Sequence, residues 1–135
     1  MRLLVFVLAA LASAGTATAQ SSMSSTDDFA LLEQYVAYIG PDDLYNSQGE
    51  RLTQPWQIVR QDRANYHRFD IQDDLDEGDT FFADAENRAI MENMLRNGSI
   101  SRAAARDVVA GGALILVEIY GHGNVGHAVQ ITTAR

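Results

Sequence analysis

The chain has 135 residues, and its 18 acidic and 10 basic residues give a formal net charge of −8 at pH 7. An anionic surface is repelled by phosphate backbones and by anionic lipids, and the arginines form no basic block, so we expect no binding to nucleic acid. The chain has no cysteine, which excludes disulfide bonds and zinc sites built on thiolates.

The first nineteen residues have the layout of a secretory signal peptide. Met1-Arg2 gives a positive start, residues 3–11 are apolar, and small residues lead to Ala17-Thr18-Ala19. This order is typical of a leader with an A-x-A cleavage site. The apolar run is about half of the ~20 residues that a membrane-spanning helix needs. We therefore expect a cleaved leader over 1–19, with neither a membrane span nor, in the absence of cysteine, a lipid anchor.

Every basic residue is an arginine, a bias typical of GC-rich genomes, and this predicts a bacterial source and an exported protein that is periplasmic or secreted. Residues 20–26 are polar and rich in serine, so we interpret them as a flexible lead-in. The remaining residues, 27–135, are long enough for a single small globular domain with its own core.

The first two predicted helices flank a stretch of turns. Thr26 is a suitable N-cap, and apolar side chains at helical spacing then predict a helix over residues 27–39, which Gly40-Pro41 ends. Residues 42–53 read as turns. Pro55 suits the first turn of a second helix, which we expect to continue to about His67.

Two further helices are predicted in the second half of the chain. The third begins near Asp84 and ends at Asn97-Gly98, where a left-handed stop is expected. The fourth is short, with Ser99 or Ser101 as its cap and a pair of glycines, 111 and 112, at its end. Its apolar residues are Ala104, Ala105, Val108 and Val109.

The last segment changes to strand character. Residues 113–120 form an apolar run rich in branched side chains, and residues 125–133 alternate between apolar and polar. We predict an α+β fold of about four short helices followed by a C-terminal antiparallel β-hairpin. A lone hairpin is marginal in water, so either the helices pack on it or one more short strand from residues 44–53 joins it.

The turn of this hairpin spells G-x-G-x-x-G, from Gly121 to Gly126. In a dinucleotide-binding unit the third glycine opens a helix whose N-terminus faces the pyrophosphate. Here a strand follows and the chain ends nine residues later. We therefore interpret the glycines as turn residues, and we expect no nicotinamide cofactor.

An acidic loop over residues 70–79 is the best candidate for a metal site. Calcium prefers six to eight oxygen ligands, and the candidate ligands are the carboxylates of Asp73, Asp74, Asp76 and Asp79. The spacing does not fit an EF-hand, because glycine and the late carboxylate fall at the wrong positions. The alternative is a solvated acidic loop that caps a helix.

The densest polar cluster follows the second predicted helix, and its candidate residues for binding a ligand or partner are Arg60, Arg63, Tyr66, His67 and Arg68. Arginine binds carboxylate or phosphate through two parallel hydrogen bonds. In a hydrolase, His67 would instead act as a base oriented by Asp62 or Asp70, although no nucleophile is marked beside it. The third interpretation is that these charges form ion pairs while the aromatic rings join the core.

The three histidines lack the spacing of a helical zinc site, so only a site assembled by the fold stays open. We therefore expect a non-catalytic binding or interaction domain, with a small hydrolase or a calcium-stabilised domain as alternatives. The cluster around Arg63 is the first candidate contact surface. The exposed edge of the hairpin is the second, and it would take a protein partner or a second copy of the chain.

Overall fold

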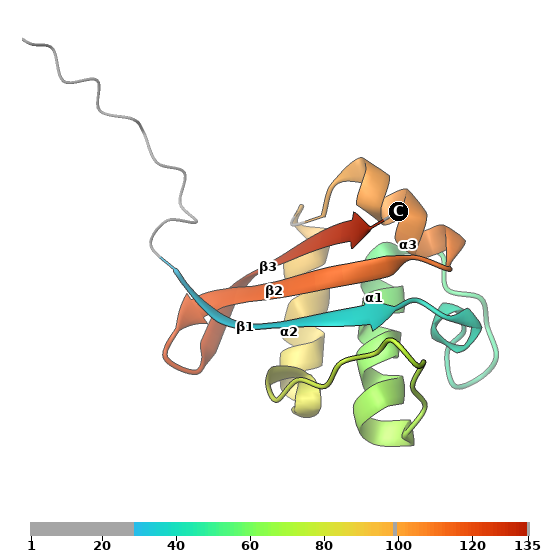
Figure 1. The fold of residues 1–135 in the computed structure, drawn as a ribbon, viewed down its shortest axis with the longest axis horizontal. Helices are drawn as coiled ribbons and strands as arrows, with labels where there is room; N and C mark the ends of the chain where they lie inside the picture. Colours follow the sequence, from blue (N-terminus) through green and yellow to red (C-terminus); the bar gives the residue numbers. More distant parts are fainter. Residues whose placement is uncertain (1–28, 99, 135) are drawn as a thin grey trace, which may run out of the picture.

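The computed structural model describes residues 29–98 and 100–134. The predicted leader and lead-in lie outside these residues. The described chain forms an antiparallel sheet and a set of helices (Figure 1). Its strands and α-helices are, in chain order, β1 (Ala30–Tyr38), α1 (Pro55–Ala64), α2 (Ala85–Arg96), α3 (Arg102–Ala110), β2 (Leu114–His122) and β3 (Val125–Ala134).

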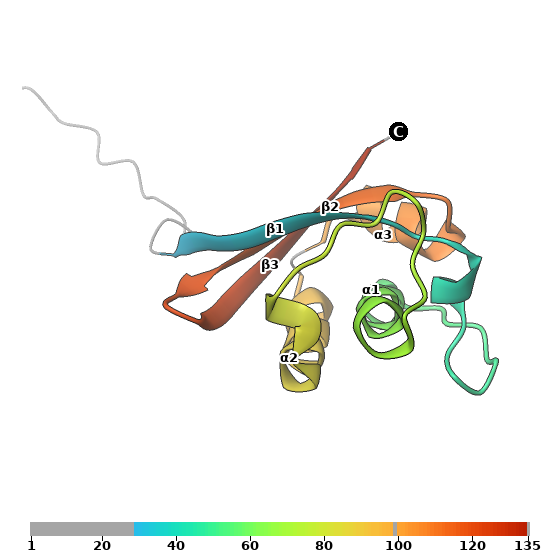
Figure 2. The same cartoon turned by 60° about the horizontal axis from the view of Figure 1, so that its bottom comes forward.

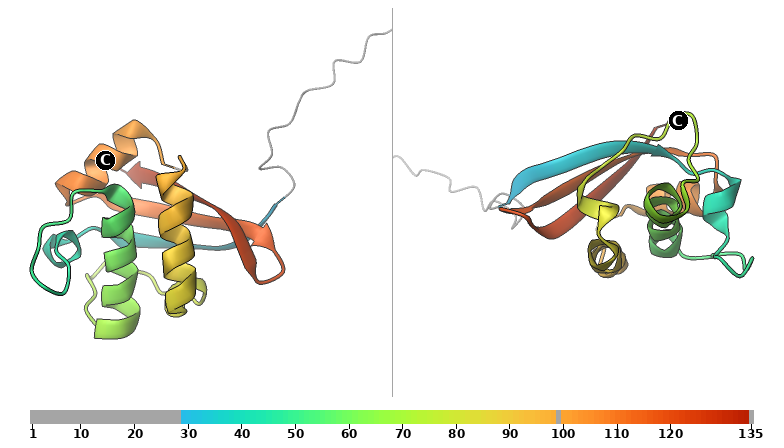
Figure 3. Two further views of the ribbon diagram at one scale, coloured as in Figure 1. Left: turned by 180° about the vertical axis from the view of Figure 1, so that it is seen from behind. Right: turned by 90° about the horizontal axis from the view of Figure 1, so that it is seen from below.

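Three short helical turns complete the described secondary structure. They are the 3-10 turns η1 (Pro41–Leu44) and η3 (Phe81–Ala83) and the π-helical turn η2 (Asn65–Phe69). Figures 2 and 3 show the sheet as one layer and α1 and α2 side by side as the other, with α3 near the C-terminal end of β3. The fold is a two-layer α+β arrangement. Among the described residues, no helix has the length and apolar character to cross a membrane.

The sheet has the order β1-β2-β3, with both neighbouring pairs antiparallel. Its inner face and the facing helix surfaces form one core. The fully buried members come from both layers; they are Tyr35, Ala37, Ile39, Ile58, Val59, Phe82, Met91, Val108, Val117 and Ile119. The opposite face of the sheet carries no helix, as Figure 2 shows.

The predicted first helix is wrong, because residues 30–38 form strand β1 instead. The sequence here supports two periods at once. Leu32, Val36 and Ile39 follow a helical spacing, whereas the side chains that are buried, those of Tyr35, Ala37 and Ile39, alternate as in a strand. β2 pairs with β1 along its whole length. A two-stranded hairpin is only marginally stable in water, and a third strand stabilises it. The tertiary pairing therefore decides the structure.

The third strand comes from β1 and not from residues 44–53. In that segment the only strand-like contact is an isolated bridge between Tyr45 and Arg51. The turn between them is held by Asn46, whose side-chain oxygen accepts hydrogen bonds from the amides of Gln48 and Glu50. Asparagine favours such turns because its side chain imitates a backbone carbonyl.

The other predicted helices are confirmed, which gives three α-helices in the described chain and not four. Pro55 opens α1. The side chain of Asp84 accepts from the Glu86 amide at the start of α2, and that of Ser101 accepts from Ala104 at the start of α3. Each cap satisfies a backbone donor that the helix itself leaves free.

The C-terminal hairpin is also confirmed, and the glycine motif serves its turn. Gly123 adopts a positive φ of 59°. A side chain at Gly121 would collide with the backbone of Val125, and one at Gly126 would lie 2.5 Å from the Phe81 ring. The glycines therefore permit a tight turn and close packing, as expected for a hairpin turn.

Candidate functional site

The two edges of the sheet differ in how they are covered. Along β1, the acidic loop pairs with the strand: the Glu77 amide donates to the Val36 carbonyl at 2.8 Å. The Val36 amide donates to Oε2 of Glu77 at 2.9 Å, and the Tyr38 amide donates to Oδ1 of Asp76 at 2.8 Å. Carboxylates that accept backbone hydrogen bonds in this way block the edge against another strand.

The pairing of β1 with the loop fixes the backbone direction across the sheet. Residues of an antiparallel strand alternately direct their N–H and C=O groups to one neighbour and to the other. Val36 directs its groups to the loop, so its register partner Leu116 directs its own away from β1. Leu116 is in register with Thr132, and Thr132 therefore hydrogen-bonds towards β2.

The same alternation along β3 then identifies which backbone N–H and C=O groups face its free edge. Gln130 and Thr132 direct their backbone groups to β2, and the outward groups belong to Val129, Ile131 and Thr133. In the described part of the chain, Ile100 is the one residue that bridges to this edge, by a single parallel contact with Ile131. The free edge of β3 is thus open on the turn side of that contact, whereas beyond it the Thr133 hydroxyl donates to Asp107 of α3 at 3.0 Å.

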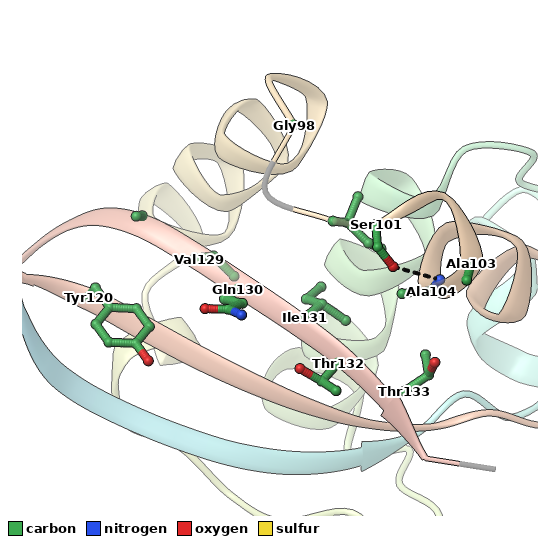
Figure 4. A pocket seen from close by; sticks show the side chains of 12 residues that line it. Gly98, Ser101, Ala103, Ala104, Tyr120, Val129, Gln130, Ile131, Thr132 and Thr133 are labelled. Atoms are coloured by element: carbon green, nitrogen blue, oxygen red, sulfur yellow. Dashed lines mark hydrogen bonds between the residues drawn. The ribbon is translucent and has the colours of Figure 1, made fainter. Parts of the chain in front are cut away.

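A hollow of about 580 Å³ lies along this open edge. Figure 4 shows the side chains of Tyr120, Gln130 and Thr132 along the strands and Ser101 across the hollow, at the beginning of α3. Its lining is apolar with a few hydroxyl and amide groups. This mixture suits an extended polypeptide, whose backbone requires hydrogen bonds and whose side chains require apolar contact.

β3 also lacks the features that normally protect an edge. Its ten residues include no charged side chain and no proline, although the chain as a whole has a net charge of −8. Natural edge strands are usually protected by charge, proline, a bulge or short length. The bulge here lies next to the turn, at Tyr120/Gly121, so it leaves the middle and the end of the strand regular.

The first candidate surface is divided by the fold, because Arg63 is completely buried. Its Nε donates to Asp62 at 2.7 Å and its Nη1 to Asp79 at 2.9 Å. Its guanidinium carbon lies 4.1 Å from the ring centroid of Tyr35 and 4.7 Å from that of Tyr66. Arg63 therefore belongs to the core, with Tyr66 as part of its enclosure, and it is inaccessible to a partner.

The electrostatics around Arg63 are those of a buried ion network. Burial acts to lower the pKa of Arg63, but Asp62, Tyr35 and Asp79 together outweigh burial, so the pKa lies above its ordinary value and the guanidinium stays charged. Burial raises the pKa of Asp62, against the attraction of Arg63. Three buried atoms find no hydrogen-bond partner among the described residues: Tyr35 Oη, Asp62 Oδ1 and Arg63 Nη2. The network thus contains strong ion pairs, but some of its buried polar atoms lack a hydrogen bond.

His67 is oriented by Asp79, and not by Asp62 or Asp70 as the sequence suggested. Its Nε2 lies 2.8 Å from Oδ1 of Asp79, and its side chain is 12% exposed. The same Asp79 oxygen also accepts from Arg63, while its other oxygen accepts from the Phe82 amide at 2.6 Å. Asp79 therefore joins the loop to α1 and η3, and His67 lies at the border of this network.

Arg60 and Arg68 remain on the surface, where they line a hollow of about 310 Å³ beside α1. Arg60 donates to Glu92 on α2 at 2.5 Å, and Glu92 also accepts from Arg96. Arg68 lies over the ring of Phe69, with 5.0 Å between the guanidinium carbon and the ring centroid. Of the five candidate residues of the first surface, these two are the most available to a ligand.

The candidate calcium ligands are separated by their internal contacts. Oδ1 and Oδ2 of Asp76 accept from the amides of Tyr38 and Asp73, while Asp79 binds Arg63. Asp74 is exposed. Within residues 29–98 and 100–134, no group of three or more histidine, aspartate or glutamate side chains is arranged to hold a metal ion. A melting experiment in excess calcium tests whether the loop binds the ion.

Sequence reasoning missed the residues that make the β3 edge distinctive. The acidic composition of the loop suggested a metal or solvent, whereas Asp76 and Glu77 cover β1. Ile100 and Ser101 carry no signal beyond the predicted helix cap. No known protein family, curated protein or solved structure matches the chain. The geometry of the described residues therefore carries the functional argument.

Proposed function

We propose that this protein is a non-catalytic binding domain that takes an extended segment of a partner protein as a fourth strand beside β3. The observation that carries this proposal is the contrast between the two sheet edges. Asp76 and Glu77 cover the edge of β1, whereas β3 has outward backbone groups, no charge and an adjacent hollow of about 580 Å³. Strand addition at such an edge is a common mode of peptide recognition.

The contact of Ile100 with Ile131 defines where the partner binds. It covers β3 at Ile131, in the second half of the strand, so the guest strand would lie beside residues 125–130, with its side chains over Tyr120 and Gln130 on the outer face of the sheet. Backbone hydrogen bonds would supply affinity, and the apolar lining around Tyr120 would supply selectivity. We further propose that the domain works outside the cytoplasm, in agreement with the leader that its sequence predicts.

A capture experiment with matched variants tests this proposal. The tagged chain is used to capture proteins from an extracytoplasmic extract of its own source, and the same is done with the double variant Gln130→Lys/Thr132→Lys. Lysine on an edge strand opposes further pairing. The control is Gln34→Lys, which adds lysine to an exposed position of the covered strand β1.

We expect one partner that the unmodified chain and Gln34→Lys capture equally and that the double variant loses. Equal capture by all three folded proteins would contradict binding at β3. If the captured protein is the chain itself, the same comparison is made by sedimentation. A concentration-dependent dimer that the double variant abolishes would identify a second copy as the partner.

A second candidate function, hydrolysis, has the pair of His67 and Asp79 in its favour. A carboxylate 2.8 Å from a partly exposed imidazole is the arrangement of an oriented general base. His67→Ala would then abolish hydrolysis and leave the melting temperature unchanged. A clear fall in the melting temperature would instead show that His67 supports the Asp79 network.

A further inference from the structure

Three aromatic rings, from β2, from β3 and from the residue before β1, meet at the turn of the hairpin. Phe29 precedes β1, His122 ends β2 and His127 lies near the beginning of β3. The ring centroids of His122 and His127 are 5.7 Å apart, with their planes inclined by 65°. Both histidines are exposed. The fold thus places two imidazoles, five residues apart along the chain, next to each other in solvent.

Phe29 restricts the positions of both imidazoles. Its ring is stacked parallel to that of His127, with centroids 4.8 Å apart and an interplanar angle of 2°, and it meets His122 edge-on at 5.0 Å. An imidazole that is already positioned loses less rotational freedom when it binds. The cluster therefore has a degree of preorganisation that two isolated surface histidines lack.

The separation of the two imidazoles fits a shared metal ion. An ion about 2.0–2.1 Å from a ring nitrogen lies roughly 3.2 Å from the ring centre. One ion can then bind both rings when their centres are separated by about 4.5 Å, for a right angle at the metal, up to about 6.4 Å, for a linear arrangement. The observed 5.7 Å lies inside this range.

We propose that His122 and His127 form a binding site for a divalent transition-metal ion of the copper and zinc type. Imidazole is the preferred ligand of these ions, whereas calcium and magnesium prefer oxygen. The two nitrogens provide half of a four-coordinate shell, and water completes it. The net charge of −8 favours the approach of a cation. The site is separate from the acidic loop, and His127 places it at the turn end of the segment of β3 beside which the guest strand would lie.

The test uses Cu²⁺ alone, because copper binds most strongly of the first-row divalent ions, and the full chain without a polyhistidine tag. Calorimetric titration should give one site in the unmodified protein. His122→Ala and His127→Ala should each weaken binding roughly tenfold or more, since half of the protein ligands are lost. His67→Ala is the matched control, because His67 contacts Asp79 on another part of the molecule, and it should bind as the unmodified chain does.

A second measurement does not depend on variants. In the nuclear magnetic resonance spectrum, substoichiometric Cu²⁺ should broaden the ring protons of His122 and His127 first and leave those of His67 sharp. The proposal is overturned by a titration without saturable binding, by equal losses in all three variants, or by broadening that begins at His67. A loss restricted to His122→Ala and His127→Ala, with folding intact by circular dichroism, supports it.

Discussion

The backbone amide of Tyr38 donates a hydrogen bond of 2.8 Å to Oδ1 of Asp76. Through this contact a carboxylate from the loop takes the place that a neighbouring strand would have beside β1. β3, at the other side of the sheet, has no such cover beyond Ile100 in the described chain. The difference between the two edges is the basis of the proposed function.

Asp76→Ala should destabilise the fold by about 1–3 kcal/mol, because it removes acceptors for two backbone amides, those of Tyr38 and Asp73, and leaves the edge of β1 partly unsatisfied. The measurement is urea unfolding followed by circular dichroism. Asp74→Ala is the control, since Asp74 is an exposed neighbour in the same loop, and it should change stability by less than about 0.5 kcal/mol. Equal effects of the two substitutions would show that the loop does not cover β1.

Arg63→Met should cost about 3–5 kcal/mol, because Asp62 and Asp79 would remain buried without their cation. Arg60→Met removes an arginine from the same helix, but that side chain is 47% exposed and its ion pair with Glu92 lies at the surface. We expect a change within about 1 kcal/mol there. The midpoints of chemical unfolding compare the two variants. An Arg63→Met protein that is well folded and unfolds at the same midpoint as the unmodified chain would contradict a structural role for the buried network.

The stability should increase as the pH falls from neutral to mildly acidic. Burial raises the pKa of Asp43 to about 6 from an ordinary value of 3.8, although hydrogen bonds from Asn65 and Gly40 lower it. A carboxyl whose pKa is higher in the folded protein binds its proton more tightly there. Its contribution to stability is complete below the ordinary pKa and is lost as the pH rises through the folded value.

Burial acts on Asp62 in the same direction. The free energy of unfolding, measured with urea between about pH 7.5 and about pH 4.5, should therefore be larger at the acidic end. Asp43→Asn should reduce this slope, because its amide does not titrate. A free energy that falls steadily on acidification would contradict the raised pKa of Asp43.

Excess calcium should leave the melting temperature unchanged. Asp76 and Asp79, two of the four candidate ligands, direct their oxygens to backbone amides and to Arg63, so a calcium ion would have to displace existing contacts. Calcium at a hundred times its dissociation constant would otherwise add about 2.7 kcal/mol, which is several degrees for a domain of this size. A rise of that size would establish a calcium site at the loop.

Local signals in the sequence predicted the helices well. The caps Asp84 and Ser101 and the opening Pro55 mark the starts of the three α-helices, because a cap acts through the nearest backbone amides and needs no distant partner. The hairpin was equally predictable, since alternation and a glycine turn are local as well. Residues 30–38 were mispredicted because their apolar residues fit two periods, and the pairing with β2 lies some eighty residues away.

The candidate site was predictable only in part. The edge of the hairpin follows from the strand pattern, but whether an edge is open depends on what covers it. Nothing in the spacing of Asp76 indicates that it accepts a hydrogen bond from Tyr38. Arg63 looked like a surface residue because arginine is rarely buried without a partner, and its partner Asp79 is supplied by a loop sixteen residues later.

The most direct test of the central claim is amide hydrogen exchange along β3, residue by residue. In the free protein, the outward amide of Val129 should exchange fast, whereas those of Ala128 and Gln130, which point to β2, should exchange slowly. On addition of the captured partner, Val129 should become protected while its two neighbours stay as they were. Slow exchange at Val129 in the free protein, or fast exchange there in the complex, would contradict strand addition at β3.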